Sequence, residues 1–287
     1  MSVFDGKLTA KQLQKYLFLF TRKQAVKSFD FVPYHYGCFS FQANQDVLTL
    51  TKYGYFNISE TDNGRFYELI KNDGFINMLK PDDKKKLLEV KEQFGKLTQT
   101  NLIRYTYQKY PYYAIKSTIA TDILNGSEII EIERQKRHFA DKQLFTIGYE
   151  GISLETYINK LIINDVNVLC DVRKNAYSQK YGFSKKTLEL ACKGVDIEYI
   201  HLPDLGIVSD KRKELRTQAD YDVLFDEYKK TTLLNNFASL LFIRNLLDKG
   251  KRVALTCFEN NPKQCHRSCV AHSLMQLPNI DYELKML

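Results

Sequence analysis

The sequence predicts an α/β fold in the C-terminal half, residues 143–287, with a mostly parallel sheet and flanking helices, preceded by a mainly helical, winged-helix-like domain in residues 1–140. After Lys142, short runs rich in β-branched residues alternate with helical segments, which is typical of a parallel sheet covered by helices. The first half shows helical spacing instead, and a charged, polar stretch at residues 125–142 separates the two patterns. We therefore predict two domains with a boundary in that stretch.

The N-terminal half is expected to begin with a helix. Thr9, followed three residues later by Gln12, forms a capping-box pattern before apolar residues at helical spacing, so this helix should cover about residues 10–20. The aromatic segment 31–37 is interpreted as a loop, because proline and glycine interrupt it.

Further short elements should follow this loop. Residues 39–53 resume a helical pattern and should turn into a short strand at residues 54–56. Residues 66–108 are interpreted as helices, one of them starting at Pro81, because proline suits a first helical turn. Helices followed by a turn and a strand indicate a winged-helix-like module, although short helices packing only for stability would give the same pattern.

The C-terminal half contains four predicted strands, at residues 144–148, 166–172, 197–201 and 252–258. The segments between them have helical spacing, at residues 153–164, 184–193 and 219–248. Functional groups in open parallel sheets gather beyond the carboxyl ends of the strands, so the residues after each strand are the site candidates.

Composition limits the class of protein. The apolar stretches are too short to span a bilayer and the N-terminus lacks a basic-then-apolar signal, so we expect a cytoplasmic protein without membrane association. Six scattered cysteines are then expected to be free thiols. Residues 1–140 carry 21 Lys and Arg against 15 Asp and Glu, a net charge of +6, and the remainder carries +2. This excess favours nucleic acid as a partner, DNA above all, although a solvated basic surface or a protein partner would also fit.

Polar residues follow the first and third predicted strands. Tyr149 and Glu150 lie between two glycines, in a turn whose backbone amides can approach an anion. His201 and Asp204 place an imidazole and a carboxylate near the same edge of the sheet, although a single histidine is more often structural. We take all four as candidates for binding a substrate or an anion.

Charged residues follow the second and fourth strands. Alternation places Asp171 and Arg173 on one face, where they can hold an anionic substrate beside an ionised acid–base group or form a structural ion pair. Glu259 ends the fourth strand. We expect Asp171, Arg173, Glu259 and Arg267 to line one cleft.

The run Cys265-His266-Arg267 should open a helix after the fourth strand. A cysteine at a helix start beside His and Arg has a lowered thiol pKa and can act as a nucleophile. Equally, Arg267 and the helix-start amides can bind an anion, or Cys265 can be structural.

The same region also offers a candidate zinc site. Cys265, Cys269 and His272 share one face of the predicted helix, and Cys257 is close in sequence. There is no paired C-x-x-C knuckle, and Cys269 also suits a buried helix position. We therefore expect neither a metal nor a cofactor.

Four ordered motifs run through the C-terminal half: Thr146-Ile147-Gly148-Tyr149-Glu150-Gly151, Asp171-Val172-Arg173, His201-Leu202-Pro203-Asp204-Leu205-Gly206, and Cys257-x-Glu259 through Cys265-His266-Arg267. Together they resemble the domain-of-unknown-function family numbered 488 over residues 143–287. The resemblance implies an α/β domain in which the motifs converge, without an established reaction. Two positions depart from the family pattern: Tyr149-Glu150 stands where many members carry a His-Ser-type pair, which puts an acid–base role for that loop in doubt, and Cys269 stands where an aliphatic residue is usual.

The N-terminal region shows a shorter resemblance. Its motifs are Leu13-Gln14-Lys15-Tyr16-Leu17-Phe18, Phe31-Val32-Pro33-Tyr34-His35-Tyr36-Gly37 and the spacing from Leu48 to Gly54. They are similar to the helical modules of the bacterial antitoxin-like proteins called Panacea, which implies winged-helix-like character. The alternative is a generic helical packing domain.

Two classes of function fit these observations. The first is a hydrolytic or base-removing enzyme acting on a nucleic acid or nucleotide, as in DNA repair or defence, with the N-terminal module positioning the polymer. The second is a non-enzymatic, antitoxin-like regulator that holds an anion at the same cluster. Within the enzyme class, we prefer a mechanism in which Asp171 and Glu259 act as acid–base groups on a bound water. Nucleophilic attack by the thiol of Cys265 beside His266 is the less favoured mechanism.

Overall fold

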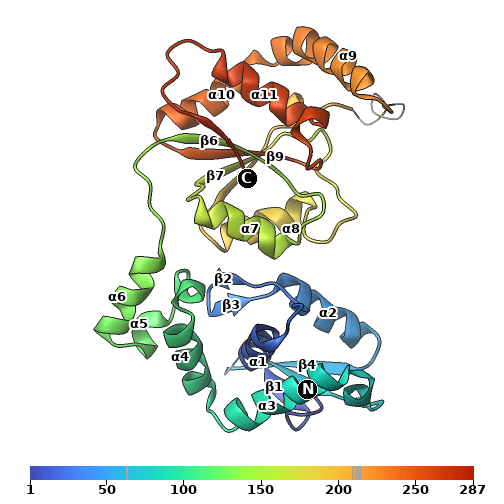
Figure 1. The fold of residues 1–287 in the computed structure, drawn as a ribbon, viewed down its shortest axis with the longest axis vertical. Helices are drawn as coiled ribbons and strands as arrows, with labels where there is room; N and C mark the ends of the chain where they lie inside the picture. The colour runs from blue at the N-terminus through green and yellow to red at the C-terminus, as the bar shows by residue number, and fades with distance from the viewer. Residues whose placement is uncertain (63, 209, 211–214) are drawn as a thin grey trace. The chain divides into compact units, whose positions relative to one another are not determined.

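The computed structural model describes residues 1–62, 64–208, 210 and 215–287, which form two compact units, Met1–Lys136 and Arg137–Leu287 (Figure 1). Lys136 lies within the polar stretch in which the sequence analysis placed the domain boundary. None of the helices in these residues combines the length and apolar character needed to cross a membrane.

The first unit is organised around helix α1, Ala10–Lys23. The amide of Gln12 donates to Thr9 Oγ1 at 3.0 Å and the amide of Thr9 donates to Gln12 Oε1 at 3.1 Å, so the predicted capping box is confirmed. Apolar residues of α1 pack in one core with residues of α3, Pro81–Phe94, and α4, Gln99–Lys109. Pro81 begins α3, as predicted.

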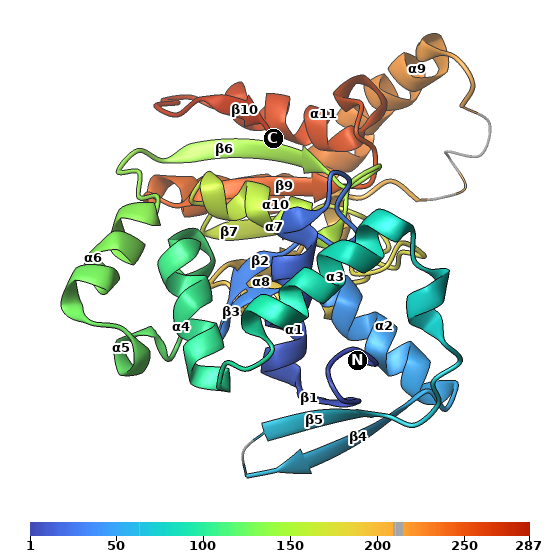
Figure 2. The ribbon, with the colours of Figure 1, turned by 60° about the horizontal axis from the view of Figure 1, so that its bottom comes forward.

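Two small sheets accompany these helices. An antiparallel sheet has the order β1-β5-β4, formed by Lys7–Thr9, Gly64–Leu69 and Phe56–Thr61, and Figure 2 shows β4 and β5 side by side. A two-stranded hairpin joins β2, Val32–Tyr34, to β3, Gly37–Phe39. The remaining elements are α2 (Phe41–Lys52), η1 (Phe75–Met78), η2 (Pro111–Ala114), α5 (Ala120–Ile123) and α6 (Gly126–Gln135).

Two predictions for this unit were wrong. Residues 31–37 were expected to form a loop, but most of them belong to the β2-β3 hairpin, which turns at His35 and Tyr36. Gly37, the first residue of β3, has a φ of +88° that favours glycine. Residues 66–69 belong to β5 instead of a helix. Because the hairpin separates α1 from α2, these helices are not joined by the short turn of a helix-turn-helix, and the winged-helix description is not confirmed.

The second unit is an α/β domain with a parallel sheet, as predicted, and this sheet has five strands. The strand order is β10-β6-β9-β7-β8, and every neighbouring pair is parallel. The strands are β6 (Gln143–Gly148), β7 (Val168–Asp171), β8 (Glu198–His201), β9 (Arg252–Cys257) and β10 (Leu284–Met286). Strand β10 was not expected from the sequence.

Helices cover both faces of this sheet. In Figure 1, α10 and α11 lie on one face, and α7 and α8 lie on the other. The helical segments are α7 (Leu154–Ile163), α8 (Lys185–Lys193), η3 (Pro203–Leu205), α9 (Gln218–Tyr228), the π-helical η5 (Lys229–Leu233), α10 (Phe237–Asp248), η6 (Pro262–Gln264) and α11 (His266–Met275). Side chains of α9, α10 and α11 form one core with those of β6, β7 and β9. Parallel pairing brings the carboxyl ends of all five strands to one edge of the sheet.

Candidate active site

A cavity of about 350 Å³ lies beyond the carboxyl ends of β6, β7 and β9. Its walls come from residues at and just after the ends of these strands, from the loop before α8, from the segment after η3 and from the first residue of α11. They are Tyr149, Arg173, Lys174, Asn175, Tyr177, Ser178, Gln179, Lys180, Ile207, Cys257, Phe258 and His266. Three of the predicted site residues, Tyr149, Arg173 and His266, therefore line one cavity at the predicted edge of the sheet.

Asp171 and Arg173 form a buried ion pair behind this wall. Arg173 Nε donates to Asp171 Oδ1 at 2.8 Å and Nη2 donates to Oδ2 at 2.5 Å. Asp171, which has no exposed surface, also accepts hydrogen bonds from the Arg173 amide and from the Tyr199 hydroxyl at 2.6 Å. Burial alone would lower the pKa of Arg173, but the hydrogen bonds and charge of Asp171 outweigh it and raise this pKa.

The rest of the Arg173 guanidinium is also engaged. Nη1 donates to the Tyr149 hydroxyl at 2.7 Å and to the carbonyl of Phe183 at 2.9 Å, and the Tyr149 ring stacks on the Phe183 ring at 4.2 Å. Arg173 thus connects the ends of β6 and β7 with the segment before α8 through hydrogen bonds. Because Asp171 is enclosed by these partners, we assign it to positioning Arg173 instead of to proton transfer.

The other predicted residues at this edge hold loops together. Glu150 Oε2 accepts from the amide of Asn260 at 2.9 Å, and His201 Nε2 donates to the carbonyl of Arg173 at 2.9 Å. Asp204 is exposed and lines a neighbouring cavity, which shares Lys174 and Ile207 with the first. Through these hydrogen bonds, Glu150 and His201 hold the backbone segments beside the cavity in position.

Arg267 fixes the turn that follows β9. Its guanidinium donates to the carbonyls of Glu259 and Asn260. The turn also packs on the end of β6, where a Cβ added at Gly148 would lie 2.1 Å from the carbonyl oxygen of Glu259, so only glycine fits. Of the four residues expected to line one cleft, Asp171, Arg173, Glu259 and Arg267, the cavity wall includes Arg173 alone.

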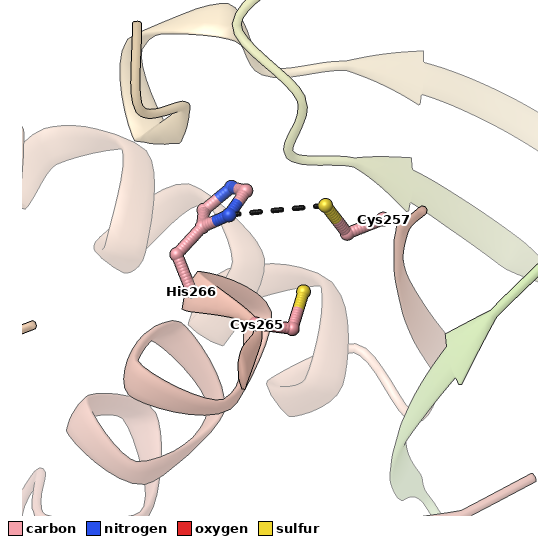
Figure 3. A group of neighbouring side chains, drawn as sticks. All are labelled: Cys257, Cys265 and His266. Atoms are coloured by element: carbon pink, nitrogen blue, oxygen red, sulfur yellow. Dashed lines mark hydrogen bonds between the residues drawn. The ribbon is translucent and has the colours of Figure 1, made fainter. Parts of the chain in front are cut away.

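Two thiols and an imidazole converge beside the cavity (Figure 3). One ligand atom each from Cys257, Cys265 and His266 lies within 4.8 Å of the others, and all three residues are buried. His266 Nδ1 is 3.8 Å from Cys257 Sγ, and the Cys257 thiol donates to Glu259 Oε2 at 3.1 Å. Cys257 and Glu259 are thus linked at the end of β9.

The expectation of a lowered thiol pKa at Cys265 was wrong. Cys265 is the N-cap residue of α11, but its side chain makes no capping hydrogen bond to the helix amides. Burial, the hydrogen bond with Cys257 and the negative charges of Cys257 and Glu259 raise its pKa well above the usual value, and the charge of Arg267 opposes this only in part. The six cysteines all lie in the described residues, and none of them is joined to another in a disulfide.

Sequence reasoning missed several residues of this site. Cys257 was weighed only as a zinc ligand, although its position at the last residue of a strand is the signal that selected the other candidates. Lys174 directly follows Arg173, and Lys180 Nζ donates to the carbonyl of Tyr149 at 2.7 Å. Tyr199 lies two residues before His201, on a strand that pairs with β7.

A comparison with known families agrees with the sequence motifs. Residues 153–274 match the family described as Domain of unknown function DUF488. No curated protein and no solved structure matches the chain. The matched residues lie within the C-terminal unit, and the match agrees with the family resemblance indicated by the four ordered motifs.

Proposed function

We propose that the C-terminal unit is a hydrolytic or base-removing enzyme that acts on a nucleotide or a nucleic acid. The observation that carries this proposal is the cavity itself, whose wall includes Lys174, Lys180, Cys257 and His266 at the carboxyl edge of a parallel sheet. Lysine ammonium groups suit phosphate oxygens, and this edge is where open α/β sheets bind ligands.

Glu259 is the general base in this proposal. Its carboxylate is half-buried and lies against the thiol of Cys257, which forms part of the cavity wall. In the reaction, a water molecule loses a proton to Glu259 while its oxygen bonds to the phosphorus or the sugar carbon of the substrate. The bond to the leaving group breaks, the electron pair stays with that group, and the protonated Glu259 returns the proton to it.

Removal of the Lys174 charge should weaken binding of a phosphate group. Lys174→Gln is expected to raise the Kd for a deoxynucleoside monophosphate roughly tenfold, since a hydrogen bond from a charged group contributes about 1.5 kcal/mol or more. Titration calorimetry measures this, with the nucleoside lacking phosphate as a second ligand. The control is Lys185→Gln, an exposed lysine outside the cavity wall, which should bind like the wild type. Equal affinity of Lys174→Gln and wild type would contradict the assignment.

We further propose that the N-terminal unit binds nucleic acid, with DNA preferred. Support comes from the net charge of +6 in residues 1–140. Binding of the full-length chain to a fluorescent DNA duplex should weaken steeply between about 50 and 200 mM salt, because each phosphate contact releases a counterion. No binding at low salt, or binding that is insensitive to salt, would contradict this proposal and favour a protein partner for the unit.

The non-enzymatic alternative makes a different prediction for the same cavity. A regulator would bind the nucleotide at Lys174 without consuming it. Binding without product formation would therefore favour an anion-binding role over catalysis.

A further inference from the structure

We infer that Cys257, Cys265 and His266 form a zinc site whose fourth coordination position faces the cavity. Cys257 ends β9, Cys265 is the residue directly before α11, and His266 is the first residue of that helix. Figure 3 shows the three side chains directed toward a common space. The site differs from the one weighed from the sequence, which grouped Cys265 with Cys269 and His272, and it replaces the expectation that no metal binds.

The donor atoms are already close to zinc-binding geometry. Tetrahedral zinc with its usual bond lengths places two sulfurs about 3.8 Å apart, and a sulfur and a nitrogen about 3.6 Å apart. Cys257 Sγ and His266 Nδ1 are 3.8 Å apart, and the three donor atoms lie within 4.8 Å of one another. Side-chain shifts of about 1 Å or less would therefore complete the set.

A backbone hydrogen bond prepares His266 to be a ligand. His266 Nε2 is 2.8 Å from the carbonyl oxygen of Val172, which can only accept, so Nε2 carries the proton. In the neutral ring, Nδ1 then holds the lone pair and is directed at Cys257 Sγ. In zinc-bound histidines, the ring nitrogen that does not bind the metal typically makes a hydrogen bond of this kind.

The chemistry of the donors selects the metal. Two thiols and an imidazole suit zinc, whereas calcium and magnesium require oxygen ligands. Cys257 is 1% exposed, Cys265 0% and His266 1%, so the ligands are held among packed side chains. Binding would deprotonate both thiols and release two protons.

The surroundings leave one side of the site open. Cys257 and His266 line the cavity, so a fourth ligand such as water would meet an incoming substrate. The Glu259 carboxylate accepts a hydrogen bond from the Cys257 thiol at 3.1 Å, so it lies next to the proposed site. Three protein ligands with an open position are typical of catalytic zinc sites, and bound zinc lowers the pKa of its water. The site stands on its own geometry and does not depend on the proposed function.

Cys269 and His272 provide matched controls from the same helix. His272 Nδ1 donates to the carbonyl of Ser268 at 2.7 Å, and both Cys269 and His272 line a different cavity. Neither belongs to the cluster formed by Cys257, Cys265 and His266. Their substitution should therefore leave the metal in place.

Metal analysis of the full-length protein, purified without a histidine tag, tests the inference. We expect about one zinc per wild-type chain, retained in Cys269→Ser, His272→Gln and Glu259→Gln but lost in Cys257→Ser, Cys265→Ser and His266→Ala. The inference is wrong if the wild type holds no zinc after incubation with zinc and removal of the excess. It is also wrong if the three ligand variants, folded by circular dichroism, retain the metal.

A second measurement needs no ligand variant. Cobalt substituted into the wild-type protein should give the sulfur-to-metal charge-transfer absorption of thiolate ligands, with visible bands typical of tetrahedral cobalt, and zinc should displace both. Absence of these bands, with all six cysteines still reacting as free thiols in denaturant, would overturn the inference whether or not the protein shows catalytic activity.

Discussion

Asp171→Asn is expected to lower the free energy of unfolding by about 3–5 kcal/mol, because it leaves the Arg173 guanidinium buried without its counter-charge. The paired groups are almost fully enclosed, with side-chain exposures of 0% for Asp171 and 6% for Arg173. Urea denaturation followed by circular dichroism measures the change.

Tyr199→Phe is the matched control for this variant. It removes one hydrogen bond to the same carboxylate and keeps the charge pair, so we expect a loss of only about 0.5–1.5 kcal/mol. If Asp171→Asn were as stable as wild type, the assignment of Asp171 to positioning Arg173 would be contradicted. A stable but inactive Asp171→Asn would instead restore the acid–base role predicted from the sequence.

Glu259→Gln is expected to reduce kcat by about 10²–10⁴-fold, because an amide cannot take the proton that the carboxylate accepts. The variant should keep its fold, since the glutamine side chain is the same size and the turn is held by Arg267 through backbone carbonyls. Its activity is compared with the wild type on the substrate that the wild type consumes.

Glu189→Gln provides the control for Glu259→Gln. Glu189 is an exposed glutamate on α8 outside the cavity wall, so its substitution should leave kcat unchanged. If Glu259→Gln retained full activity, proton transfer by Glu259 would be excluded and the Cys257–His266 pair would become the candidate for catalysis.

The parallel sheet was predictable because its strands are strongly patterned. Buried parallel strands are nearly continuous apolar runs, and β6 and β9 are buried along their whole length. The helix at Ala10 was predictable for a local reason, since its capping box lies within four consecutive residues. The edge strand β10 has only three residues and is partly exposed. Such a short segment shows too little alternation of apolar and polar residues to be identified as a strand from the sequence.

The site was only partly predictable, because strand ends indicate a location but not the contacts made there. Asp171 and Arg173 were correctly placed at the edge of the sheet, but their mutual burial depends on Tyr149, Tyr199 and Phe183, which come from distant segments. The pKa of the Cys265 thiol is raised instead of lowered for the same reason. The sequence suggests that the helix start lowers this pKa, but burial and the neighbouring Cys257 raise it. Burial and long-range pairing therefore decide the role of each polar residue.

Product formation by the full-length wild-type protein tests the proposed function most directly. The protein is incubated with a pool of nucleotides and, separately, with single-stranded and duplex DNA, and the products are separated by anion-exchange chromatography. We predict release of phosphate, of a shortened oligonucleotide or of a free base from at least one substrate, and loss of that product by about 100-fold or more in Glu259→Gln. No product from any of these substrates, or equal product formation by the variant, would contradict the account.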